Sequence, residues 1–188
     1  MAPLYIALLH HPIYDKNGAV VTTAVTNLDV HDIARLAKVY GLRAFYVVTP
    51  VVTMRRLVAR IIDHWKTGTG ADYNPTRKEA LELVRLTETL ETTICEVERD
   101  AGAMPRVVAT SARPGEGRIS FADLRSCLAT ESVPCLILLG TGWGLTEESL
   151  AKADLVLEPI RGRGSYNHLS VRAAAAVILD RLRGDRYI

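Results

Sequence analysis

Short apolar runs alternate along the chain with longer segments whose apolar residues recur every three or four positions. The runs predict strands, because β-branched and aliphatic residues dominate them, over residues 3–12, 43–50, 105–112, 133–140 and 153–160. The segments of helical period predict helices over residues 27–41, 51–65, 76–99, 120–129 and 165–184. This alternation is typical of an α/β fold, in which helices flank both faces of a parallel sheet.

The longest predicted helix begins near Thr76 and ends near Arg99. Its expected buried stripe is Leu83, Leu86, Leu90, Ile94 and Val97. Just before this helix, glycine, asparagine and proline interrupt both the helical and the strand pattern of apolar residues. Residues 67–76 are therefore expected to form a mobile loop. The chain contains no internal repeat or low-complexity linker, and residues 1–188 are expected to form a single domain.

The net charge, the N-terminal apolar run and the cysteine spacing argue against several classes of function. With 188 residues and a net charge of +2, the chain lacks the global basic charge that would by itself indicate nucleic-acid binding. Its N-terminal apolar run is too short to span a membrane and lacks the charged flank of a signal peptide. Cys95, Cys127 and Cys135 show neither paired nor metal-ligand spacing, so no metal is expected and a cytoplasmic location is favoured.

The stretch LLGTGWGLTEE, residues 138–148, places three glycines directly after the strongest apolar run. A dinucleotide loop is disfavoured, because the spacing is G-x-G-x-G and the loop follows the fourth predicted strand rather than the first. A Walker A phosphate loop is excluded by the missing Gly-Lys-Ser/Thr. A nucleoside-like cofactor held by main-chain groups and a tight turn that merely needs positive φ both remain open.

Three segments in order resemble the SPOUT, or α/β-knot, RNA methyltransferases. They are the glycine loop, the strand end LVLEPIRGRG at 155–164, and the Ala-rich segment SYNHLSVRAAAAVILDRL at 165–182. NLDVHDIARLAKVYGL, residues 27–42, is similar to the first motif of the family. The resemblance implies a C-terminal trefoil knot and S-adenosylmethionine as the cofactor.

The resemblance also implies four walls around that cofactor, each made of a loop or strand end. They are Thr110, Ser111 and Ala112; Leu139, Gly140, Thr141, Gly142 and Gly144; Leu157, Glu158, Pro159 and Ile160; and Tyr166, Asn167, His168 and Leu169. Glycine suits such a wall, because a Cβ would push the cofactor away from the backbone.

The candidate catalytic residues are Arg35, Asp29 and His31 on the first predicted helix. The resemblance assigns Arg35 to activation of the target, where a permanently charged guanidinium would stabilise an oxyanion or a phosphate; pairing with Asp32 on a solvated face is the alternative. Asp29 stands where ribose-methylating members carry asparagine, so it is a candidate general base for a ring nitrogen or a helix cap formed with Thr26. His31 could shuttle a proton or have no role.

Basic residues are the candidate RNA contacts: Arg161 and Arg163 among glycines, and Arg55 and Arg56 on the second predicted helix. Solvated charges, on a loop and on a helix face, are the alternative. His10 and His11 end the first strand, where α/β folds place ligands. The expected function is methyl transfer from S-adenosylmethionine to a ribose hydroxyl or base nitrogen of tRNA or rRNA. The resemblance implies a homodimer. The alternatives are a catalytically inactive knotted protein that binds nucleotide or RNA, and a dinucleotide-dependent oxidoreductase.

Overall fold

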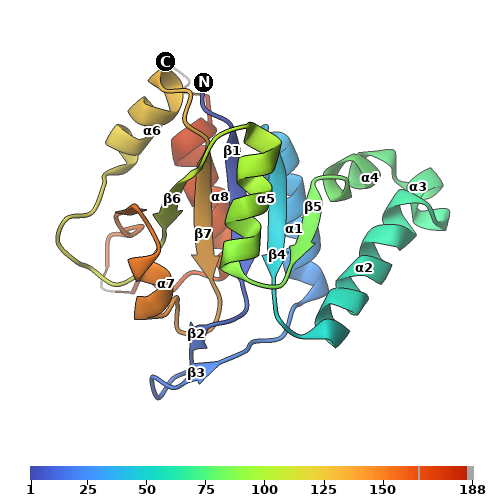
Figure 1. Cartoon of the computed structure of the whole chain (residues 1–188), viewed down its shortest axis with the longest axis horizontal. Helices are drawn as coiled ribbons and strands as arrows, with labels where there is room; N and C mark the ends of the chain where they lie inside the picture. Colours follow the sequence, from blue (N-terminus) through green and yellow to red (C-terminus); the bar gives the residue numbers. More distant parts are fainter. Residues whose placement is uncertain (165, 186–188) are drawn as a thin grey trace.

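One parallel sheet forms the centre of the computed structural model, which describes residues 1–164 and 166–185. Its strands are β1 (Leu4–Leu9), β4 (Ala44–Val48), β5 (Val84–Thr87), β6 (Arg106–Ala109), β7 (Cys135–Gly140) and β8 (Leu155–Val156). Their spatial order is β5-β4-β1-β7-β6-β8, and all neighbours are parallel (Figure 1). The predicted α/β fold with a parallel sheet is confirmed, as are the five strands predicted from apolar runs.

Helices cover both faces of the sheet, as expected. The face toward the viewer in Figure 1 carries α5 (Leu90–Ala101) and α7 (Glu147–Ala151). The opposite face carries α1 (Asn27–Val39), α2 (Val52–Lys66), α4 (Pro75–Leu81), α6 (Phe121–Thr130) and α8 (Val171–Arg183). Strand β1 lies at the middle of this arrangement and is buried on both sides: Ile6 faces the α1 side, whereas Tyr5 and Ala7 face α5.

The prediction of one helix from Thr76 to Arg99 is wrong. The chain forms α4, then β5, then α5, and β5 pairs with β4 through Phe45 opposite Val84. Thr89 starts α5, because its side chain accepts a hydrogen bond from the Thr92 amide and caps the helix. The leucines spaced by three or four therefore lie in a turn (Leu83), in β5 (Leu86) and in α5 (Leu90), not on one helical face.

The loop expected over residues 67–76 is also wrong. Residues Thr69–Tyr73 form the short helix α3, and α4 begins at Pro75. The Asn74 side chain accepts a hydrogen bond from the Arg77 amide, and proline occupies the first helical position, where its missing N–H costs nothing. The same residues that break one helix thus start the next.

The closing helix begins at Val171, six residues later than predicted. Ser170 caps it by accepting a hydrogen bond from the Ala173 amide. Residues 166–170 are therefore irregular chain beside the sheet, and Ser165 lies outside the described residues.

The order of the strands creates a crevice at one edge of the sheet. From β1 the chain proceeds outward to β4 and β5, and the later strands β6, β7 and β8 lie on the other side of β1. The switch in direction falls between β1 and β7, and α/β proteins bind ligands at the carboxyl ends of the strands beside such a point. His10, Thr110 and Thr141 all follow strand ends here.

Within the described part of the chain, no helix has the length and apolar character needed to span a bilayer.

Candidate functional site

A cavity of about 830 Å³ opens at this switch point. It lies at the carboxyl ends of β6, β7 and β8 and is closed on its other side by the N-terminus of α8 and by residues 23–29. All residues predicted to hold the cofactor line it, except Pro159. The four predicted walls, which are separated by up to 59 positions in the sequence, thus meet around one space of the size typical for small-molecule sites.

The glycine loop owes its composition to its own packing. A Cβ on Gly140 would lie 2.9 Å from the Leu145 amide nitrogen, and one on Gly142 would lie 3.0 Å from the Tyr14 carbonyl oxygen. Gly142 and Gly144 also have φ values of +55° and +104°, which favour glycine. Close approach at Gly140 and Gly142, and positive φ at Gly142 and Gly144, therefore explain these glycines without reference to a ligand.

Segment 13–21 holds the glycine loop in place. Strands β2 (Ile13–Tyr14) and β3 (Val20–Val21) form a hairpin, and the Trp143 amide donates to the Tyr14 carbonyl at 3.0 Å. This hairpin was not predicted, although Asn17-Gly18 between apolar pairs is its usual signal. The hairpin leads into residues 23–29, which complete the cavity.

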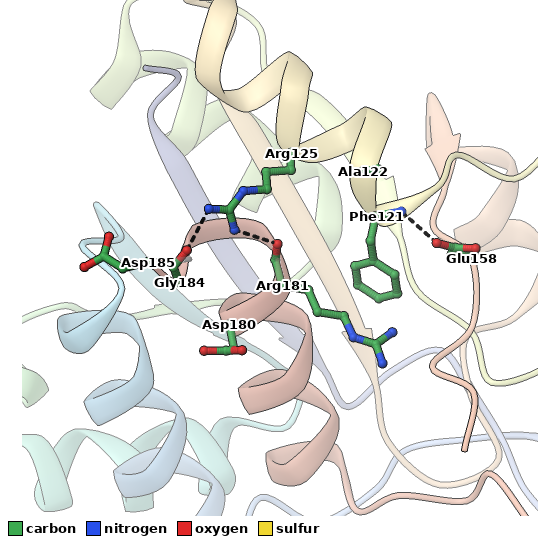
Figure 2. A pocket seen from close by; sticks show the side chains of 8 residues that line it. All are labelled: Phe121, Ala122, Arg125, Glu158, Asp180, Arg181, Gly184 and Asp185. Atoms are coloured by element: carbon green, nitrogen blue, oxygen red, sulfur yellow. Dashed lines mark hydrogen bonds between the residues drawn. The ribbon is translucent and has the colours of Figure 1, made fainter. Parts of the chain in front are cut away.

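The third wall is locked by hydrogen bonds to its neighbours. The Glu158 amide donates to the Ile119 carbonyl, and the Glu158 carboxylate accepts from the Phe121 amide at 2.8 Å, at the N-terminus of α6. Figure 2 shows this contact beside a smaller hollow between α6 and α8, where Arg125 donates to the Arg181 and Gly184 carbonyls. The Glu158 carboxylate is thus already used for positioning α6, while the residue also lines the cavity.

The fourth wall is irregular chain held at one point. The Asn167 side-chain amide donates to the Ala112 carbonyl at 2.7 Å, which ties this wall to the first. The rings of Tyr166 and His168 meet edge to face at 5.5 Å between centroids. This contact leaves the Tyr166 side chain 77% exposed.

Asp29 is the predicted catalytic residue that the structure places on the cavity. Its side chain is mostly buried, and it receives a 2.5 Å hydrogen bond from the Thr26 hydroxyl, which also caps α1. Its other oxygen lies 3.3 Å from the Arg172 guanidinium of α8, and Arg172 bonds Asp32 at 3.0 Å. The carboxylate is therefore held by two partners from two elements, while it borders the open space.

His10 lies buried beside this carboxylate. Its Nδ1 atom is 3.1 Å from the Thr23 hydroxyl, which lies 2.5 Å from the Thr141 hydroxyl of the glycine loop. Its Nε2 atom is buried and has no hydrogen-bond partner among the described residues. Burial lowers the pKa of His10 to about 4, although the charge of Asp29 opposes the shift. His10 is therefore neutral at physiological pH and links β1 to two walls of the cavity.

This burial predicts a pH-dependent stability. Below pH 6.5 the unfolded chain protonates His10, whereas the folded chain resists protonation until about pH 4, so the stability is lost as the pH falls through this window. Between pH 7.5 and 4.5 the His10 contribution to the free energy of unfolding should fall by about 2.5 kcal/mol. Urea unfolding of the wild type and of His10→Asn at both pH values measures it. The exposed His168→Asn variant is the control, and an equal fall in wild type and His10→Asn would contradict the assignment.

Arg35 and His31 lie away from the cavity. Arg35 is exposed on α1 and forms no ion pair with any described residue, and its expected partner Asp32 bonds Arg172 instead. His31 is half-buried with its ring 5.6 Å from that of Trp65, edge to face. Burial, and next the charge of Arg77, lower the pKa of His31.

The predicted RNA contacts are distributed over two regions. Arg161 and Arg163 are exposed between the third and fourth walls, directly beside the cavity. Arg56 is exposed on α2, but Arg55 is partly buried, donating to the Thr49 carbonyl at 2.7 Å and pairing with Glu88. Arg55 thus serves the α2–β4 junction.

Several cavity residues were absent from the sequence-based set. They are Thr23, Ala24, Thr26, Arg113, Trp143, Ser170, Val171, Ala174 and Ile178. The sequence could have indicated Trp143, because a tryptophan between two glycines is unusual in a simple turn.

Comparison with known proteins now identifies the family. A family model described as SAM-dependent RNA methyltransferase matches residues 3–184. The chain belongs to this family. The family's cofactor, S-adenosylmethionine, agrees with the cofactor that the resemblance implied.

Individual relatives agree with this family. A protein of Oleidesulfovibrio alaskensis named tRNA (guanine-N(1)-)-methyltransferase is 44% identical over 182 residues, which is 97% of this chain but 42% of that relative. An uncharacterized protein of Aquifex aeolicus is 41% identical over 95% of this chain and 87% of its own length. The chain thus spans less than half of the relative whose activity is named.

A solved structure supports the fold. The TrmJ structure from Z. mobilis matches with a TM-score of 0.64 at 15% identity, covering 99% of this chain and 70% of its own. The predicted resemblance to RNA methyltransferases is confirmed by the family model, and the likeness to this structure shows that the fold is shared.

The cavity fits S-adenosylmethionine chemically. Leu139, Leu157 and Ile178 give apolar surface against which a purine can pack, and the strand ends supply main-chain groups for its polar edge. The Asp29 carboxylate at the rim complements a positively charged sulfonium.

Proposed function

We propose that this chain transfers a methyl group from S-adenosylmethionine to a nucleotide of tRNA or rRNA. The observation that carries the proposal is the cavity at the strand switch point, with a held carboxylate at its rim, in a chain of the SAM-dependent RNA methyltransferase family. Exposed arginines beside the cavity supply charge for the RNA backbone.

Asp29 acts as the general base in this proposal. When bound, S-adenosylmethionine supplies a methyl group already activated on a sulfonium. Asp29 accepts the proton that the attacking atom loses, and Thr26 and Arg172 keep the carboxylate oriented while it does so. A carboxylate favours a base nitrogen over a ribose hydroxyl, because the nitrogen proton is more acidic. The named guanine-N(1) activity of a longer relative supports the same choice.

Arg35 enters the proposal through a homodimer, whereas a proton shuttle by His31 stays a prediction. Leu28, Arg35 and Val39 lie on one face of α1, and the two apolar side chains are 58% and 74% exposed. A second copy covering this face would bury both and bring Arg35 close to a neighbouring subunit. Sedimentation equilibrium measures this association.

The proposal extends to the chain's path and cellular setting. We propose one methyltransferase domain closed by a trefoil knot, supported by the packing of α8 against both α1 and α6 and by the insertion of β7 between β1 and β6. A cytoplasmic location is supported by the proposed RNA substrate and by the free thiols of Cys95, Cys127 and Cys135.

Calorimetry and nucleoside analysis test the function. The protein is expected to bind S-adenosylhomocysteine and not NAD, and to methylate RNA taken from a strain that lacks it. Mass spectrometry of the digested RNA would then show one added methyl on one nucleoside. Binding without methyl transfer would favour the inactive RNA-binding alternative, and binding of NAD alone would favour the oxidoreductase.

A further inference from the structure

Trp143 is an exposed tryptophan on the rim of the cavity. Its side chain is 59% exposed, and it lies between Gly142 and Gly144 in the loop after β7. Burying a tryptophan is favourable, so a large aromatic surface left in water beside a ligand site indicates a contact made on binding.

The backbone under Trp143 is held in place. The Trp143 amide donates to the Tyr14 carbonyl, and the Gly144 amide donates to the Thr141 carbonyl, both at 3.0 Å. The Thr141 hydroxyl donates to the Leu9 carbonyl at the end of β1. The loop is thus hydrogen-bonded to the hairpin and to the central strand. Because the turn that carries the indole is already ordered, a ligand that binds the indole loses little free energy in ordering the loop.

Basic side chains surround the same rim. Arg113 lines the cavity, and Arg161 and Arg163 follow its third wall. All three are exposed, and none pairs with an acidic group in the described residues. Tyr166, on the fourth wall, adds a second exposed aromatic ring.

We propose that Trp143 is the stacking platform for an unpaired base of the RNA substrate, next to the nucleotide that is methylated. Aromatic rings with arginines between them bind single-stranded nucleic acid, because the rings stack on bases and the guanidinium groups contact phosphates. A base inside a duplex has both faces covered, so the substrate site lies in a loop, a bulge or a single strand. This inference rests on the proposed function and names the form of RNA that the site accepts.

Tryptophan fluorescence tests the contact, since the chain has two tryptophans, Trp65 and Trp143. The difference between wild type and Trp143→Phe isolates the Trp143 emission. A mixed-sequence single-stranded RNA dodecamer should quench it, and an abasic dodecamer of the same length should not. Trp143→Ala should weaken dodecamer binding by about 5- to 150-fold, the range for loss of one base stack, while Trp143→Phe stays close to wild type.

Salt dependence separates stacking from charge. Trp143→Ala should keep the wild-type slope of log Kd against log salt, whereas the double variant Arg161→Gln, Arg163→Gln should reduce it. An unchanged Kd for Trp143→Ala, or no dodecamer binding by the wild type, would overturn the proposal. So would quenching of Trp143 by S-adenosylhomocysteine alone, which would assign the indole to the cofactor. Failure of the proposed function appears separately, as absence of heat on titration with S-adenosylhomocysteine.

Discussion

Asp29→Asn is expected to lower methyl transfer by about 10²- to 10⁴-fold, the usual contribution of a general base. The amide keeps the size of the carboxylate and can still accept the Thr26 hydroxyl, but it cannot take a proton from the substrate nitrogen. Binding of S-adenosylhomocysteine should change only a few-fold. Transfer of labelled methyl groups to RNA at saturating cofactor measures the effect.

Asp32→Asn is the matched control for this variant. Both carboxylates lie on α1 and both bond Arg172, but only Asp29 lines the cavity. The Asp32 variant therefore loses a comparable ion pair without losing a proton acceptor, and its activity should stay within a few-fold of wild type. If Asp29→Asn retained activity while its melting temperature fell, Asp29 would be a structural residue that caps α1 and orders α8.

The sequence predicted those helices and strands whose own residues show a clear local pattern, such as an apolar run or a helix cap followed by an apolar face. Strand β7 is an uninterrupted apolar run, and α1 combines a Thr26 cap with a clear apolar face, so both were found. Strand β5 has no such signal. Val84, Arg85, Leu86 and Thr87 become a strand because β4 offers them a parallel partner, which is a long-range pairing that no local period reports.

The walls of the cavity were predictable from the sequence, but which of the candidate catalytic residues on α1 faces the cavity was not. Parallel strands bring their carboxyl ends to one edge, so motifs at the ends of β6, β7 and β8 had to meet. Which face of α1 points to that edge depends on how α1 packs against α8. Asp29, which pairs with Arg172 of α8, lines the cavity, whereas Arg35 lies outside it.

Gly142→Ala is expected to damage both the fold and the cofactor site. The new methyl group would lie 3.0 Å from the Tyr14 carbonyl oxygen and 3.0 Å from the Ile13 side chain, at a φ of +55°. The backbone strain should lower the free energy of unfolding by about 1–3 kcal/mol. Since the loop must shift to relieve the contact, the hydroxyls of Thr141 and Thr23 separate. Affinity for S-adenosylhomocysteine should then fall about tenfold, which corresponds to about 1.4 kcal/mol of lost contact with the displaced loop.

Gly102→Ala distinguishes strain from damage to the site. Gly102 ends α5 at a φ of +75°, and no atom lies within 4 Å of its added methyl group. It carries a similar backbone cost but precedes the amino end of β6, whereas the cavity lies at the carboxyl end of that strand. Its unfolding free energy should therefore fall while its cofactor affinity stays unchanged. Urea unfolding and calorimetry on both variants give the comparison. Equal affinity in Gly142→Ala and wild type would mean that the glycine loop is only a turn, and the cofactor would have to be held by the other three walls.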